Sequence, residues 1–362
     1  MSIRAFILLS IAALVAVLPC ATAAPIIVGQ AIDLSGANGS IGRDYVAGIT
    51  TYFDSINVKG GINGRKIQYM VSDDRGVAAD SARLVSSLVK EQHADYLLGG
   101  IGSDATAATL AAPAFAESRH VLFAPLADSN AASSSRVLYW RPSIESEFLF
   151  LLVYFEKLGF KQVSIALQDT PQNNKAFQFV SAELRKRHMT LAGVAKISGS
   201  GAAVQAEAQR LGAASPKVVI TIADTYASAQ FLRAFRRYDQ ASFVAGTSLT
   251  NLTMLSEIAG APATAFTVFS QVVPNPGSAV SALQSEHIEM MKRFRDEPVS
   301  SVTLEGFAVA KTLVRMMRQQ GAKGAPATMD LGGMIVGTPA GGYNMSRFVD
   351  IALFTKGGGL MF

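Results

Sequence analysis

Cysteine is almost absent from this sequence. The 362 residues include one, Cys20, and it lies in an apolar N-terminal segment that we expect to be removed. The remaining chain has no cysteine, so it can form neither a disulfide framework nor a thiolate metal cluster. About 340 residues can be stabilised by a hydrophobic core alone, and this length suggests two domains.

Histidine is also scarce, and the common catalytic motifs are missing. The four histidines, at positions 93, 120, 188 and 287, lack the spacing of metal ligands. No G-x-S-x-G elbow, P-loop or H-E-x-x-H motif occurs. The glycines of residues 36–42 (GANGSIG) do not have the spacing of a dinucleotide fingerprint. We therefore predict a protein that is not an enzyme and that uses no cofactor and no metal.

Neither a strong net charge nor a long internal apolar run is present. The formal net charge is +5, and the basic residues are spread along the chain. The densest basic cluster, residues 184–189 (LRKRHM), is typical of the solvated face of an amphipathic helix. These features argue against a nucleic-acid partner. Beyond the N-terminus no apolar run reaches the ~18 residues that a membrane helix needs.

The N-terminus has the pattern of a secretory signal peptide. Arg4 precedes the apolar residues 5–18, and a small-x-small site ends at Ala23. We predict that residues 1–23 are the signal peptide and that cleavage follows Ala23. Lipidation of Cys20 is the alternative, but Pro19 stands where a lipoprotein signal has a small residue. The chain is therefore expected to be exported and soluble.

Strand and helix patterns alternate along the rest of the chain. The apolar run IIVGQAI is followed by the helical pattern DYVAGITTYFDSIN, and GGINGRK then indicates a helix end and an Asn-Gly turn. Further strands are predicted in KIQYMVS, ADYLLGG and HVLFAPL, and a helix over 103–119 that Pro113 kinks. After residues 139–142 (YWRP) the alternation restarts. Two such blocks predict two mainly parallel sheets with helices on both faces.

The end of the chain does not fit a simple two-block division. Two helical patterns, at about 279–295 and over VTLEGFAVAKTLVRMMRQQ, follow the second block without strands of their own. We therefore predict an α/β fold with two doubly wound, Rossmann-like lobes. Lobe 1 comprises residues 24–142 plus 273–327, and lobe 2 comprises 143–272 plus 328–362. Three crossovers between the lobes would form a hinge.

The order of these segments resembles the type I periplasmic binding proteins, specifically the leucine/isoleucine/valine-binding family of ABC importers. The matching stretches are IIVGQAIDLSG, GITTYFDSINVKGGINGRKIQYMVSDDRG, YLLGGIGSDATAA, VLFAPLA, QFLRAFRRY and TLEGFAVAKTLV. The resemblance covers nearly all of the chain after the signal peptide. It implies a periplasmic location, a small-molecule ligand in the interlobe cleft, hinge closure, and docking on ABC permease subunits at the inner membrane. We expect a monomer.

The resemblance implies ligand contacts in the first lobe at two strand ends. The strand YLLGG leads into a helix start, where free N–H groups and hydroxyls attract a carboxylate. Ordinary N-capping by Ser103 is the alternative role for this loop. In the second loop, APLAD, a threonine common in the family is absent. The candidate residues are Ser103, Asp104, Ala105, Thr106, Leu126, Ala127 and Asp128.

The facing lobe offers a second set of candidates, and here the sequence departs from the family. Gln172 replaces an expected tyrosine. Thr247 and Ser248 stand near the place where amino-acid binders carry an acid for the ligand ammonium. A buried ammonium without a carboxylate would be costly, so Asp224 substitutes or the ligand has no ammonium. The candidates are Gln172, Asp224, Thr225, Tyr226, Thr247 and Ser248.

The sequence thus predicts the extracytoplasmic solute-binding component of an ABC importer. Its ligand would be a small carboxylated metabolite, either an amino acid or a related organic or aromatic acid. A ligand-sensing module that feeds a signalling partner is the first alternative, and an exported enzyme on the same fold is the second. The segment 321–330 is shorter than the helix that family members usually have there.

Overall fold

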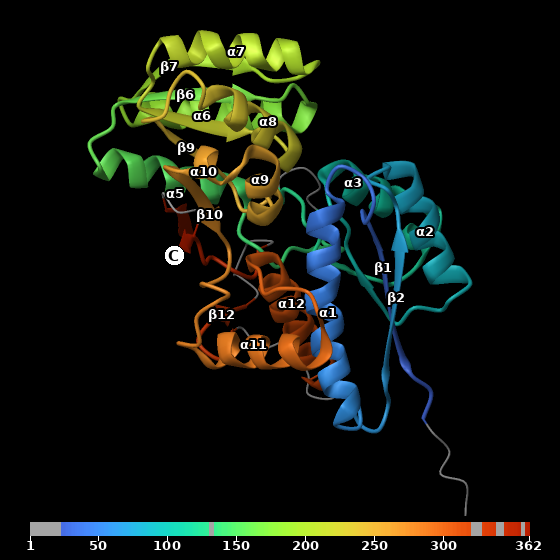
Figure 1. Cartoon of the computed structure of the whole chain (residues 1–362). Coiled ribbons are helices and arrows are strands. Elements are labelled where there is room, and N and C mark those ends of the chain that lie inside the picture. Colours follow the sequence, from blue (N-terminus) through green and yellow to red (C-terminus); the bar gives the residue numbers. More distant parts are fainter. Residues whose placement is uncertain (1–22, 130–133, 320–327, 338–343, 356–358) are drawn as a thin grey trace, which may run out of the picture.

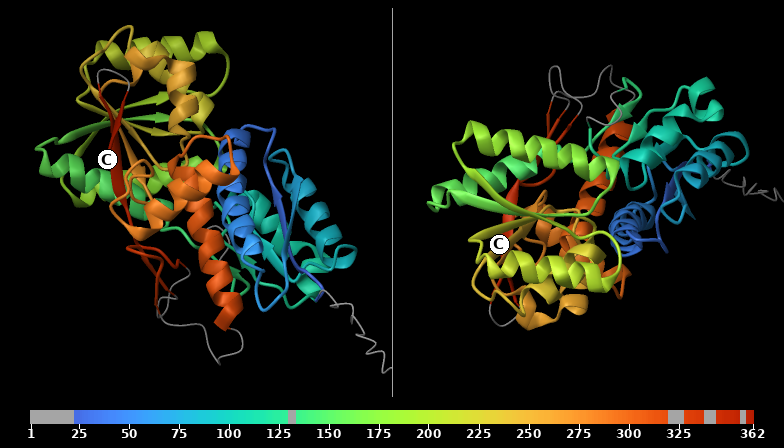
Figure 2. Two further views of the ribbon diagram at one scale, coloured as in Figure 1. Left: turned by 60° about the horizontal axis from the view of Figure 1, so that its bottom comes forward. Right: turned by 90° about the horizontal axis from the view of Figure 1, so that it is seen from above.

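The computed structural model describes residues 23–129, 134–319, 328–337, 344–355 and 359–362, which form two α/β lobes (Figure 1). The lobes remain distinct in the two further views of Figure 2. The predicted signal peptide lies outside the described residues except for Ala23, as does most of segment 321–330. Within the described part of the chain, no helix combines the length and apolar character needed to cross a membrane.

The first lobe contains a five-stranded parallel sheet with the order β2-β1-β3-β4-β5. Helices α1, α11 and α12 cover one face of the sheet, and α2 to α4 cover the other. The strands are β1 (Ile26–Ile32), β2 (Ile67–Asp73), β3 (Tyr96–Leu98), β4 (Leu122–Phe123) and β5 (Val137–Leu138). The helices are α1 (Gly39–Val58), α2 (Ala78–Lys90), α3 (Ser103–Ala111), α4 (Pro113–Glu117), α11 (Ala282–Phe294) and α12 (Ser301–Gln319).

The second lobe contains a seven-stranded sheet with the order β14-β13-β10-β9-β8-β6-β7, in which β13 and β14 run antiparallel to their neighbours. Strands β8 and β10 are buried throughout, as expected for parallel strands covered on both faces. The strands are β6 (Gln162–Leu167), β7 (Thr190–Lys196), β8 (Val218–Ile222), β9 (Phe243–Gly246), β10 (Thr267–Gln271), β13 (Asp350–Phe354) and β14 (Leu360–Met361). The helices are α5 (Ile144–Lys157), α6 (Pro171–Lys186), α7 (Gly201–Ala213), α8 (Thr225–Phe235), α9 (Leu252–Ala259) and α10 (Ala261–Thr264).

The chain passes between the lobes three times, after β5, after β10 and before β13. The boundary that we predicted at residue 328 is too early. Strands β11 (Met329–Asp330) and β12 (Ile335–Val336) form a separate hairpin. Its buried apolar side chains, namely Met329, Leu331, Met334 and Val336, pack into the core beneath α1, α11 and α12. In the described part of the tail, only β13 and β14 join the second sheet, because they pair with β10 and with each other.

Two local predictions can be compared directly with the backbone. Asn63 and Gly64 both have positive φ angles, 50° and 79°, and Ile62 pairs with Arg65 in an antiparallel bridge, so the predicted tight turn is confirmed. The predicted kink at Pro113 is a complete break between α3 and α4. Proline lacks the N–H that would continue the helix and pushes the residue before it out of the helical region.

Helices α1 and α12 approach each other closely at two glycines. A Cβ atom on Gly48 would lie 2.0 Å from the carbonyl oxygen of Thr303, and one on Gly306 would lie 2.2 Å from that of Tyr45. Glycine permits such backbone contact because it carries no side chain. The contact joins a helix near the start of the chain to one near its end.

Candidate functional site

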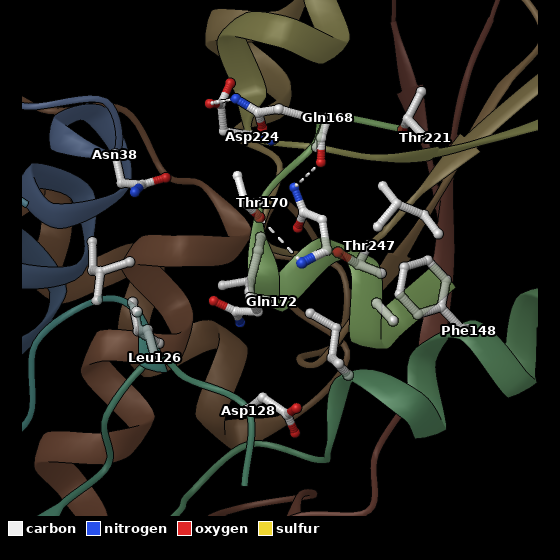
Figure 3. Close-up of a pocket in the computed structure, with 18 residues that line it drawn as sticks. Asn38, Leu126, Asp128, Phe148, Gln168, Thr170, Gln172, Thr221, Asp224 and Thr247 are labelled. Atoms are coloured by element: carbon white, nitrogen blue, oxygen red, sulfur yellow. Dashed lines mark hydrogen bonds between the residues drawn. The ribbon is translucent and has the colours of Figure 1, made fainter. Parts of the chain in front are cut away.

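A cavity of about 240 Å³ lies between the lobes, with residues of both in its lining (Figure 3). The first lobe contributes residues that follow β1, β3 and β4, among them Asn38, Gly102 and Asp128. The second lobe contributes residues that follow β6, β8 and β9, among them Gln168 and Asp224. All these loops leave the carboxyl ends of parallel strands, which is where ligands bind in open α/β sheets.

The first-lobe side of the cavity is the start of α3. Gly102 lines the cavity with a φ of 99°, and Ser103 begins the helix directly after it. Ser103 is 6% exposed, and its Oγ has no hydrogen-bond partner among the described residues. The first N–H groups of a helix have no intrahelical acceptor. A helix start with a spare hydroxyl is therefore a suitable place for a carboxylate.

The second-lobe side is organised by Asp224, the N-cap of α8. Its Oδ1 accepts a hydrogen bond from the Ala227 N–H at 2.8 Å, and its Oδ2 accepts one from Gln168 Nε2 at 2.7 Å. Gln168 Oε1 in turn accepts the Asp224 N–H at 2.9 Å. These bonds fix an acidic side chain and an amide side chain across the ends of neighbouring strands β6 and β8, next to the cavity.

The charges and the apolar surface of the cavity are distributed unevenly. Asp128 and Asp224 face it from opposite lobes, and none of its described lining residues is a lysine, an arginine or a histidine. Ile144 and Phe148 of α5 and Ile222 of β8 supply an apolar wall, of which Phe148 is labelled in Figure 3. The arrangement suits a small ligand that carries an ammonium for the acids, a carboxylate for the helix start and an apolar body.

The structure places five of the thirteen candidate residues in the cavity lining, namely Leu126, Asp128, Gln172, Asp224 and Thr247. Residues 103–106 form the first turn of α3, directly beyond Gly102.

The remaining predicted residues have other surroundings. Ala127 is buried beside Leu126. Thr225 is buried, and its Oγ1 accepts the Asn251 N–H at 3.0 Å. Tyr226 is 53% exposed on the first turn of α8. Ser248 lies in a second cavity and accepts a hydrogen bond from an arginine.

Several lining residues were missed at the level of sequence. Asn38 lies in the GANGSIG loop, which we compared only with the dinucleotide fingerprint. Gln168 directly follows β6 and lay at the end of the predicted strand QVSIALQD, so the rule that ligands bind at strand ends would have found both. Phe148 gave no signal, because a phenylalanine in an amphipathic helix is indistinguishable from a core residue.

No group of three or more potential metal-ligating side chains occurs in the described part of the chain. A family model described as "Periplasmic binding protein" matches residues 25–345, which is most of the sequence. This chain belongs to the periplasmic binding protein family. Among curated relatives, an "Amino acid binding protein" of Pseudomonas aeruginosa is 32% identical over 83 residues. That alignment covers 23% of this chain and only 22% of the relative.

Solved structures of periplasmic binding proteins have the same two-lobed fold. A substrate-binding periplasmic protein from Ralstonia solanacearum has a TM-score of 0.84 and 24% identity, over 93% of this chain and 99% of that one. The branched-chain amino acid transporter substrate-binding protein LivJ from Streptococcus pneumoniae, solved with isoleucine, has a TM-score of 0.80 and 16% identity, over 93% and 98%. The type I fold predicted from the sequence is thus confirmed.

Proposed function

We propose that this periplasmic binding protein holds a small amino acid in the interlobe cavity and delivers it to an ABC importer. One observation carries the proposal: Asp224 lines the cavity from the second lobe and Asp128 from the first, and the start of α3 borders the cavity on the first-lobe side. The acids favour an ammonium, and the free N–H groups of α3 favour a carboxylate. Of the two alternatives that the sequence left open, we propose the one in which Asp224 is the partner of the ligand ammonium.

The proposed mechanism is hinge closure. The ligand contacts one lobe first, and the other lobe then closes onto it as the lobes rotate about the three crossovers. Closure requires that the ligand bind the closed form more tightly than the open one. We propose that the carboxylate binds at α3 and that Asp224, with Gln168 and Gln172, completes the site from the second lobe.

The cellular setting is part of the same proposal. Cleavage after Ala23 would release the mature protein into the periplasm as a monomer, and the closed form would dock on permease subunits at the inner membrane. We propose that the protein is not an enzyme. Among the described lining residues, threonine hydroxyls are present without a histidine or lysine to act as their base. Ligand recovered from the protein should therefore be chemically unchanged.

The test is a thermal-shift screen of the mature protein against amino acids and the matching carboxylates and amines. A ligand at a hundred times its dissociation constant should add about 2.7 kcal/mol to the free energy of unfolding. Asp224→Asn is the informative variant, because asparagine is an equally good N-cap but lacks the charge. It should weaken an amino acid at least about tenfold and leave the matching carboxylate unaffected.

The control is Asp169→Asn, which removes a carboxylate near the cavity that is not part of its lining. Equal loss of affinity in both variants would refute the role assigned to Asp224. Binding of carboxylates but of no amino acid would refute the proposed ligand class.

A further inference from the structure

A second cavity, also of about 240 Å³, lies between the lobes beside the first. The two cavities share the loop between β9 and α9: Thr247 and Leu249 line the first, whereas Ser248 and Thr250 line the second. In Figure 1, α9 of the second lobe lies close to the start of α1 in the first. The second cavity is therefore a separate space lined by the same loop.

The second-lobe wall of this cavity presents hydrogen-bond donors that no described residue uses. Asn251 is 5% exposed, and its Oδ1 caps α9 by accepting the Met254 N–H at 3.0 Å. Its Nδ2 has no acceptor among the described residues, and the same is true of the hydroxyl of Thr250, which is 4% exposed. The first N–H groups of α9 add donors that the helix itself does not satisfy. Because these unused donors line the cavity, they suit a polar occupant that carries acceptor oxygens.

The first-lobe wall presents an acid instead. Asp44 lines the cavity, and one of its oxygens accepts a hydrogen bond from the Ser300 hydroxyl at 2.8 Å. Burial raises the pKa of the Asp44 carboxyl, so a nearby cation would stabilise its charged form. The side chain of Gln271 is buried, and its Oε1 has no donor among the described residues. None of the described lining residues is a lysine, an arginine or a histidine.

We propose that this second cavity binds a small zwitterion. Its carboxylate is held by Thr250, Asn251 and the start of α9, and its ammonium pairs with Asp44 and Gln271. The inference goes beyond the function proposed above, because it concerns different residues. Since the occupant bridges the lobes, it stabilises them at their present separation and thereby changes the affinity of the first cavity.

The test is a residue-resolved NMR titration of the mature protein with three probes that have the same number of carbon atoms. β-Alanine carries both charges, propionate only the carboxylate and propylamine only the ammonium. β-Alanine should cause saturable shifts of the backbone amides of Leu252 and Thr253 and of the Asn251 side-chain amide. Propionate and propylamine should each bind there at least about tenfold more weakly than β-alanine. Equal binding of β-alanine and propionate, or no shift at these groups, would overturn the proposal.

Two substitutions make the test specific. Asn251→Asp keeps the cap of α9 but replaces the donor by a charge, so it should abolish the shifts. Asp44→Asn keeps an acceptor for Ser300 and should remove the preference for β-alanine over propionate. Asp169→Asn, whose side chain lines neither cavity, should leave both results unchanged.

Shifts confined to Gly102 and Ser103 would mean that β-alanine binds only in the first cavity. That result would overturn this inference while leaving the proposed function intact. Conversely, an amino-acid screen in which Asp224→Asn weakens no hit, with intact shifts at Leu252 and Thr253, would refute the proposed function alone.

Discussion

A buried ion pair at the hinge gives the sharpest stability prediction. Arg141, on the first crossover, donates from Nε and Nη2 to the two carboxylate oxygens of Glu305 in α12, each at 3.0 Å. Both side chains are about as buried as the apolar core, with 4% and 5% exposed. Arg141 also donates to Ser248 Oγ at 3.0 Å, so it connects α12 of the first lobe to the β9–α9 loop of the second.

A third buried charge, that of Glu147, makes the loss of Arg141 and the loss of Glu305 unequal in their cost to stability. Glu147 of α5 is fully buried and accepts hydrogen bonds from the Ser248 N–H at 2.9 Å and from Ser270 Oγ at 2.6 Å. Its charge and that of Glu305 both raise the pKa of Arg141 against the effect of burial. Removing one partner of a buried pair costs about 3–5 kcal/mol. Glu305→Gln leaves Arg141 beside Glu147, so we expect the lower end, about 3 kcal/mol.

Arg141→Met should cost more, because it leaves two buried carboxylates without a cation. We expect about 5 kcal/mol near neutral pH, and part of it should return in acid, where one carboxyl takes up a proton. Burial already raises the pKa of Glu305. Urea denaturation of the mature protein at two pH values measures both variants. Equal losses in the two variants, or an Arg141→Met penalty that does not depend on pH, would refute this reasoning.

Two further predictions concern the packing of the first lobe. His287 is fully buried against α12, and desolvation lowers its pKa to about 4. Below a pH of about 6.5 the unfolded chain binds a proton at His287 more readily than the folded chain does. The contribution of His287 to the free energy of unfolding is therefore complete above the unfolded pKa of about 6.5 and falls by about 3 kcal/mol as the pH drops to 4. His287→Gln should flatten this part of the stability profile measured by urea denaturation. Gly48→Ala should destabilise the protein by about 1–3 kcal/mol, because the added methyl group forces α1 and α12 apart. Gly201→Ala is the control and should be neutral in the same assay, because a Cβ atom there meets open space. Equal effects of the two substitutions would refute the close-contact argument.

The features of this structure that depend on local sequence periodicity could be predicted, whereas those that depend on tertiary packing could not. The alternation of strand and helix depends on local periodicity, so IIVGQAI and DYVAGITTYFDSIN indicated β1 and α1 correctly. The hairpin β11–β12 was assigned to the wrong lobe, because two-residue strands carry no periodic signal and their place depends on tertiary burial. The family resemblance led to Gln172, and the strand-end rule led to Asp224. It could not reveal Phe148, whose place in the cavity depends on how α5 is rotated.

The hydrogen-bonded pair of Asp224 and Gln168 shows a further limit of prediction from the sequence. Each residue was visible at the end of its own predicted strand, but only the order β8-β6 makes them neighbours. The second cavity was equally hidden, since Asp44 and Asn251 are far apart in sequence and belong to different lobes. Single-sequence patterns describe elements, whereas sites depend on which elements meet.

The glycine contact between α1 and α12 has a consequence for the order of folding events during synthesis. Helix α12 follows α1 only after most of the second lobe has been made. Contacts between segments so far apart in sequence form slowly. The first lobe therefore cannot complete its core until α12 has left the ribosome.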